Sequence, residues 1–129
     1  TGVCWGSTSN TALVRVPLCR SDKPNSMRVE IRNPDPSCNP YLAFAALLAA
    51  GLKGIEKKYP LPAEGSSDPA LRLPETLAEA LDCFEKSVLM KETFGDTIMN
   101  VFSENKRLEI QEFNAYVTDF EIRKHFPVL

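Results

Sequence analysis

The stretch "RVEIRNPDPSCNPYL", residues 28–42, decides the fold because a strand, a corner and a helix start follow one another in it. Its first five residues alternate between charged and apolar, as a strand with one buried face does. Side chains alternate between the two faces of a strand, so we expect Arg28, Glu30 and Arg32 on the same face. The strand rise places the Glu30 carboxylate about 6 to 7 Å along the strand from each arginine.

The second half of the stretch predicts a corner followed by a helix. Three prolines fall within "NPDPSCNP", residues 33–40, where neither a helix nor a strand continues easily. Asn39 is a favourable N-cap, and Pro40 follows where the first helical turn tolerates proline. The spacing therefore predicts a helix from Tyr41 to about Lys57.

This helix is apolar round nearly its whole circumference, which predicts a central position with cover on several sides. Gly51 and Gly54 lower its helix propensity, so we interpret them as points of close backbone approach.

The rest of the chain reads as strands before this helix and helices after it. The segment "TALVRVP", residues 11–17, is rich in β-branched residues and is expected to pair with the strand of residues 28–32 as a hairpin. An amphipathic helix is expected from Pro74, a short helical turn over 88–93 closed by Gly95, and a long final helix from Asp96 through about Phe120. The predicted fold class is α+β, with short hairpin-like strands followed by a mainly α-helical C-terminal region.

The composition suits one globular domain and disfavours several kinds of partner. The chain has 129 residues, of which 43% are hydrophobic and 25% charged, with a net charge of -2. That balance gives no overall field for nucleic acid or an anionic membrane. The longest apolar run, residues 41–52, is too short to span a bilayer. The start lacks signal-peptide character and an initiator methionine, which indicates a processed chain or a piece of a longer one.

Cys4, Cys19, Cys38 and Cys83 form no CxxC pair, so zinc and redox sites are not favoured. Two disulfides are possible in principle. Free thiols in a reducing cytoplasm are the favoured interpretation, and they predict a cytoplasmic location.

The alternating arginines and glutamate have two interpretations. From pattern alone, a solvated charge ladder on a strand face is favoured. The alternative is a carboxylate that binds a metal ion between guanidinium groups that hold phosphate or carboxylate. A third arginine, Arg15, in the neighbouring strand candidate strengthens the second interpretation. His125, the only histidine, is expected to be solvated, so no Ser/His/Asp set can be assembled.

These segments carry a family resemblance. Residues 9–17 and 28–55 resemble, in order, the patterns N-R-[ST]-A-x-[IV]-R-[IV]-P and R-[IV]-E-x-R-x-P-D-P-x-x-N-P-Y-L, followed by a helix ending in A-G-L-x-G-I. These patterns belong to the C-terminal part of the catalytic domain of type I glutamine synthetase. The segment "LPETLAEAL" also looks like the last helical segment of that family. The resemblance implies that residues 1–129 are the C-terminal portion of such a domain, with the N-terminal domain and upstream catalytic strands absent.

The resemblance also implies an activity and roles for residues. The family joins glutamate and ammonia through a γ-glutamyl phosphate, using ATP and Mg²⁺ or Mn²⁺. By motif position, Glu30 corresponds to a metal ligand and Arg32 to the arginine that binds substrate glutamate. Arg15 and Arg28 correspond to arginines that face the ATP phosphates. No catalytic residue is implied within the chain, because the other carboxylates and the histidine of the site lie upstream in the family.

The resemblance leaves three functions open. The first is the C-terminal part of a glutamate–ammonia ligase, inactive by itself and assembled with the remainder of the synthetase chain into a dodecamer. The second is a γ-glutamyl-amine ligase, which accepts another amine. The third is a non-catalytic module, which is favoured by Asn10 because the family pattern has arginine at that position.

Overall fold

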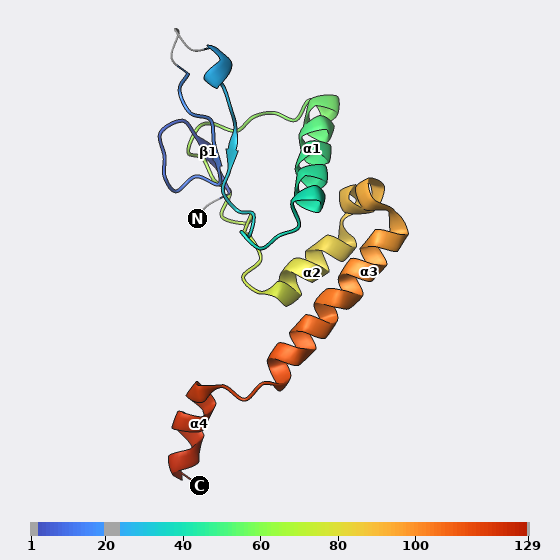
Figure 1. The fold of residues 1–129 in the computed structure, drawn as a ribbon. Coiled ribbons are helices and arrows are strands. Elements are labelled where there is room, and N and C mark those ends of the chain that lie inside the picture. Colours follow the sequence, from blue (N-terminus) through green and yellow to red (C-terminus); the bar gives the residue numbers. More distant parts are fainter. Residues whose placement is uncertain (1–2, 20–23, 129) are drawn as a thin grey trace. The chain divides into compact units, whose positions relative to one another are not determined.

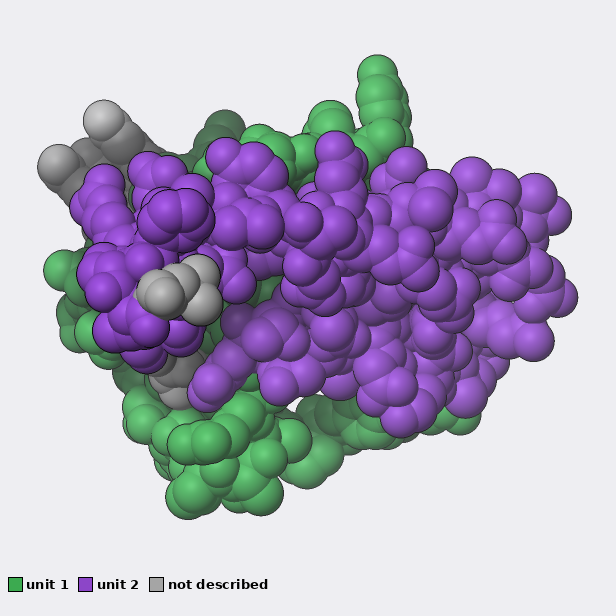
Figure 2. All heavy atoms as spheres, turned by 90° about the horizontal axis from the view of Figure 1, so that it is seen from below, with its two compact units in different colours: residues 1–73 green, residues 74–129 purple. Residues whose placement is uncertain are grey.

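The computed structural model describes residues 3–19 and 24–128. The chain divides into two compact units, residues 1–73 and 74–129, which are coloured separately in Figure 2. Among the described residues, none of the helices combines the length and the apolar character that crossing a bilayer requires.

The order of elements agrees with the predicted α+β class: short strands come first and helices make up the C-terminal region (Figure 1). The first unit contains β1 (Trp5–Gly6), β2 (Val14–Arg15), the 3-10 turn η1 (Pro24–Ser26), β3 (Glu30–Ile31) and α1 (Pro40–Lys57); the second contains α2 (Leu77–Lys86), α3 (Val88–Ala115), α4 (Asp119–His125) and the 3-10 turn η2 (Phe126–Val128).

The three strands form one small sheet in the order β1-β2-β3. Strands β2 and β3 are antiparallel and place Arg15 opposite Glu30, which confirms the predicted hairpin-like pairing. Strand β1 runs parallel to β2, with Trp5 opposite Val14. The sequence did not predict β1, because two residues are too few to show an alternating pattern.

Helix α1 begins and ends as its sequence predicts. The Asn39 side chain accepts hydrogen bonds from the backbone N–H groups of Tyr41 at 3.0 Å and Leu42 at 3.4 Å. At the other end Lys58 adopts a left-handed conformation with φ of 51°, and its N–H donates to carbonyls of the last turn. These local caps define both ends of the helix.

The described residues do not supply the cover predicted over α1. None of its residues is buried, and Tyr41, Phe44 and Ile55 are each more than two-thirds exposed. Gly51 and Gly54 face open space, so they are not sites of close approach here. No described element packs against α1. Its apolar side chains therefore form an exposed apolar surface among the described residues.

The second unit has a small apolar core between α2 and α3. Leu81 of α2 and Met99 of α3 are buried, and the ring of Phe84 lies 5.1 Å from that of Phe102. Helix α2 starts after Thr76, whose side chain accepts from the Glu79 N–H, rather than at Pro74 as predicted.

The predicted break at Gly95 is confirmed, whereas the predicted extent of the last helix is wrong. Gly95 interrupts α3 with φ of 70° and ψ of 167°. Helix α3 ends at Ala115 instead of continuing through Phe120, and α4 starts afresh. A capping box between Thr118 and Glu121 causes the new start, because it satisfies two backbone donors outside α3.

Candidate anion-binding site

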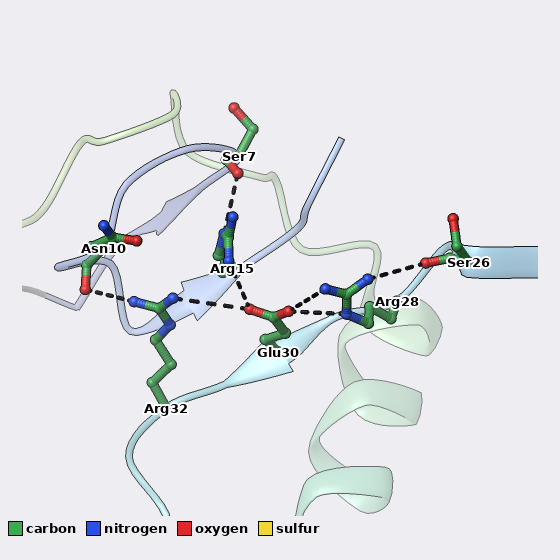
Figure 3. Close-up of polar contacts among 7 residues, drawn as sticks. All are labelled: Ser7, Asn10, Arg15, Ser26, Arg28, Glu30 and Arg32. Atoms are coloured by element: carbon green, nitrogen blue, oxygen red, sulfur yellow. Dashed lines mark hydrogen bonds and ion pairs between the residues drawn. The ribbon is translucent and has the colours of Figure 1, made fainter. Parts of the chain in front are cut away.

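Three arginines surround one carboxylate, as Figure 3 shows; Arg15 comes from β2 and the other residues from the segment 28–32, which contains β3. The antiparallel register places Arg15 of β2 directly opposite Glu30 of β3. Arg28 and Arg32 flank Glu30 along its own chain segment, two residues away on either side. We call Arg15, Arg28, Glu30 and Arg32 the arginine cluster.

The two oxygens of Glu30 are contacted from different directions. Arg28 contacts Oε1 through Nε at 2.9 Å and through Nη2 at 2.8 Å, which is a close, fork-like pair. Arg15 Nη1 lies 3.4 Å from Oε2, and Arg32 Nη2 lies 3.9 Å from the same oxygen. Glu30 is therefore held firmly by Arg28 and more loosely by the other two.

Each arginine also donates to a backbone carbonyl outside the cluster (Figure 3). Arg32 Nη1 donates to the carbonyl of Asn10 at 2.5 Å. Arg15 Nε donates to the carbonyl of Ser7 at 3.4 Å, and Arg28 Nη1 to that of Ser26 at 3.5 Å. These carbonyls hold the guanidinium groups apart and limit how far they can turn.

The cluster is partly shielded and carries excess positive charge. The side chains of Arg15, Glu30 and Arg32 are about 30% exposed, whereas that of Arg28 is 57% exposed. The hydrogen bond from Arg28, together with attraction to Arg15, holds the pKa of the Glu30 carboxyl below its usual range, against the opposing effect of partial desolvation. Three guanidinium groups and one carboxylate leave a formal charge of +2, which favours an anionic ligand.

The same residues do not fit a divalent cation by themselves. Mg²⁺ and Mn²⁺ need several oxygen ligands, and both oxygens of Glu30 already face guanidinium groups. Within residues 3–19 and 24–128 there is no group of three or more His, Cys, Asp or Glu side chains that could hold a metal. What the described cluster can do is bind an oxyanion through several guanidinium N–H groups.

All four residues predicted from the motif come together in this cluster. His125 belongs to the second unit and is exposed at the end of α4. Sequence reasoning missed the supporting residues. Glu64 accepts hydrogen bonds from both the backbone N–H and the hydroxyl of Ser7. No local pattern signals that contact, because 57 residues separate the two positions.

Comparison with known proteins places the chain in a family. Residues 1–125 match the family model described as "Glutamine synthetase, catalytic domain". The chain belongs to the glutamine synthetase family. It matches the C-terminal part of that catalytic domain, which confirms the family indicated by the sequence motifs.

Curated relatives agree with this assignment. A glutamine synthetase of Mycobacterium tuberculosis strain H37Rv is 41% identical to this chain, and the match covers 99% of this chain and 31% of that protein. A glutamine synthetase of Archaeoglobus fulgidus is 41% identical over 98% of this chain and 28% of its own length. A gamma-glutamylethanolamide synthetase, GlnA4, of Streptomyces coelicolor is 40% identical over 98% and 27%. The chain therefore spans less than a third of the length of the curated relatives it matches.

Solved structures share the fold. The structure of apo GmaS without ligand superposes with a TM-score of 0.79 and 28% identity, and the match covers 97% of this chain and 30% of that one. A Plasmodium falciparum glutamine synthetase gives a TM-score of 0.76 at 20% identity, covering 96% and 34%. Both matches support the α+β architecture.

The family pattern also clarifies the departure at position 10. Asn10 occupies the position of an arginine in N-R-[ST]-A. In the structure its main-chain carbonyl, rather than its side chain, accepts the hydrogen bond from Arg32. The anchor of Arg32 is therefore independent of the residue type at position 10.

Proposed function

We propose that residues 1–129 are the C-terminal portion of the catalytic domain of an ATP-dependent glutamate–ammonia ligase that works through γ-glutamyl phosphate. The observation that carries this proposal is the arginine cluster, in which the charged residues of the family motif meet with a formal charge of +2. Phosphoryl transfer is catalysed chiefly by positioning and by positive groups around the phosphate oxygens.

We assign Arg15 and Arg28 to the ATP phosphates and Arg32 to the carboxylate of substrate glutamate. The exposure of Arg28 supports its role, because a ligand can reach a side chain that is 57% exposed. Arg15 and Arg32 are more shielded, and each is anchored to a carbonyl, which supports roles in orienting a bound anion. No residue of this chain is assigned a covalent or proton-transfer role.

We assign Glu30 as one ligand of Mg²⁺ or Mn²⁺, with the remaining ligands supplied by other parts of the catalytic domain. A bound divalent cation would neutralise charge that develops on the transferring phosphoryl group. The described residues supply too few ligands to hold the metal without ligands from other parts of the catalytic domain.

The exposed face of α1 supports a place within a larger domain. Phe44, Leu48 and Leu52 are each more than half exposed. Burying such side chains from water is favourable by about 1.5 to 3 kcal/mol each. We propose that the remainder of the synthetase covers this face, that the complete protein forms the dodecamer typical of type I enzymes, and that its location is cytoplasmic.

The first test measures the chain alone. A phosphate-release assay with glutamate, ammonia, ATP and Mg²⁺ is expected to give no turnover above background for the 129-residue chain, since it supplies one carboxylate of a site that needs several. Glutamine formation at ordinary enzymatic rates by this chain would contradict the proposal.

The second test separates the arginine cluster from other acidic surface. In the complete synthetase, Glu30→Ala is expected to weaken metal binding and abolish turnover. Glu56→Ala removes an equal charge from a side chain that is 65% exposed on α1, so we expect little change. Equal effects of the two substitutions would show that Glu30 has no special role.

A γ-glutamyl-amine ligase is the second candidate. It is favoured by the match to the gamma-glutamylethanolamide synthetase at 40% identity, close to that of the glutamine synthetases. The two candidates share the phosphorylation of glutamate and differ in the nucleophile. Comparing kcat/KM of the complete enzyme for ammonia and for ethanolamine decides between them.

A further inference from the structure

A loop that is distant in sequence from the arginine cluster makes contacts that support it. Residues 62–65, which we call the brace segment, lie against the end of β1. Trp5 Nε1 donates to the carbonyl of Pro62 at 2.8 Å, and the N–H of Gly65 donates to the carbonyl of Trp5 at 2.9 Å. Gly65 has φ of 74°, a conformation that glycine adopts without strain.

Glu64 of the brace segment fixes the residue that follows β1. Its Oε1 accepts the backbone N–H of Ser7 at 2.5 Å and the Ser7 hydroxyl at 2.6 Å. The donation from the Ser7 hydroxyl is the main reason that the pKa of the Glu64 carboxyl lies below its usual range, so this acceptor is ionised at neutral pH. Ser7 lies one residue beyond β1, where sheet pairing does not reach.

Ser7 in turn holds Arg15. The carbonyl of Ser7 accepts the hydrogen bond from Arg15 Nε, while Arg15 Nη1 is directed to Glu30 (Figure 3). A hydrogen bond at Nε restrains the plane of a guanidinium group and leaves its terminal nitrogens to contact other groups. The chain of contacts therefore runs from Glu64 through Ser7 to Arg15.

We propose that Glu64 is a positioning residue, which orients the Arg15 guanidinium toward bound phosphate by fixing the Ser7 peptide groups. The inference rests on the proposed role of Arg15 in binding phosphate. Glu64 itself contacts no ligand in this role. Glu64 acts by restricting the orientation of the Arg15 guanidinium, whose other contact is with Glu30.

The sign of the effect distinguishes positioning from simple charge. Removing a carboxylate makes the surroundings more positive, so a purely electrostatic effect of Glu64→Ala would strengthen anion binding. Positioning predicts the opposite. We expect Glu64→Ala to weaken the binding of inorganic triphosphate to the 129-residue chain by about tenfold, as is typical of residues coupled through one hydrogen-bond network. The affinity is measured by calorimetry without metal. Glu64→Gln retains an acceptor oxygen, so we expect a smaller loss.

Two further variants complete the design. Glu56→Ala removes the same charge elsewhere in the same unit and is expected to leave the affinity unchanged or slightly raised. In a double-mutant cycle, adding Glu64→Ala to Arg15→Ala is expected to cause no further loss, because the residue that Glu64 orients is already missing. Independent, additive losses would overturn the proposal.

A spectroscopic measurement tests the link without relying on the proposed function. In NMR spectra of the 129-residue chain, Glu64→Ala is expected to shift the Arg15 Nε–H resonance. The Trp5 indole N–H reports whether the brace segment keeps its place, because it donates to Pro62 independently of Glu64. If Arg15→Ala leaves triphosphate binding intact, the proposed role of Arg15 in phosphate binding fails. The Arg15 Nε–H resonance then decides by itself whether Glu64 orients Arg15. An unchanged Arg15 resonance in Glu64→Ala overturns the proposal.

Discussion

Leu81 of α2 offers a quantitative test of the apolar core in the second unit. Among the described residues, Leu81 and Met99 are the two buried apolar side chains of this unit, each 7% exposed. Leu81→Ala removes three carbon groups, and at about 0.8 kcal/mol per buried group the lost transfer free energy is about 2.4 kcal/mol. The core is small and open at its sides, so we expect neighbouring side chains to close much of the cavity. The expected loss of unfolding free energy is about 2 to 3 kcal/mol.

The assay is urea denaturation followed by far-ultraviolet circular dichroism, with the slope compared between variants. Leu108→Ala is the matched control, because it makes the same chemical change on α3 at a side chain that is 64% exposed. Its expected loss is below about 0.5 kcal/mol. If the two variants lose the same stability, the packing of α2 on α3 does not depend on Leu81 and the reasoning is refuted.

Three other predictions concern the caps, the break in α3 and the carboxylates. Asn39→Ala is expected to reduce α1 stability by about 1 kcal/mol, seen as lost helicity, whereas Asn105→Ala on an exposed face of α3 should preserve it. Gly95→Ala should lower the midpoint of thermal unfolding by imposing strain of about 1 to 3 kcal/mol, because φ is 70° there although space is open. Because its pKa is lowered in the folded state, Glu30 stabilises the folded chain at pH values above the ordinary carboxyl pKa. This stabilisation is lost as the pH falls through the folded-state pKa. Denaturation between neutral pH and pH of about 3 should therefore show a shallower loss for Glu30→Gln than for the wild type, and an identical slope would contradict this.

Local signals were enough to predict the arginine cluster. Alternation in residues 28–32 placed Arg28, Glu30 and Arg32 on one face, and antiparallel pairing then brought Arg15 opposite Glu30. The start of α1 was equally readable, because an N-cap and a proline are chemical requirements of the first turn. In both cases neighbours in sequence or across a hairpin settle the structure.

Two helix starts were misplaced even though their signals were present. Thr76 and Thr118 each stand three residues before a glutamate, Glu79 and Glu121, which is the pattern of a capping box. Apolar residues that continue past residue 113 favoured one long helix. The local hydrogen bonds of the cap outweighed that periodicity, because little of this surface is buried within the described chain.

Long-range features could not be predicted in the same way. The apolar character of α1 predicted cover, but periodicity shows only which faces could be buried and not what lies against them. The Glu64 to Ser7 contact joins a loop to a strand end 57 residues away, and "LPAEG" has the composition of any surface turn. Such contacts depend on the path of the whole chain.

Position 10 shows how geometry and charge separate within the site. The orientation of Arg32 depends on the carbonyl of residue 10, which every amino acid has, so asparagine preserves this anchor. The positive charge that the family pattern carries at this position depends on the side chain, and asparagine lacks it. The arginine cluster can therefore keep its arrangement with one cation fewer beside it. Under the proposed function, this substitution bears on affinity for the transferring phosphoryl group rather than on whether the site assembles.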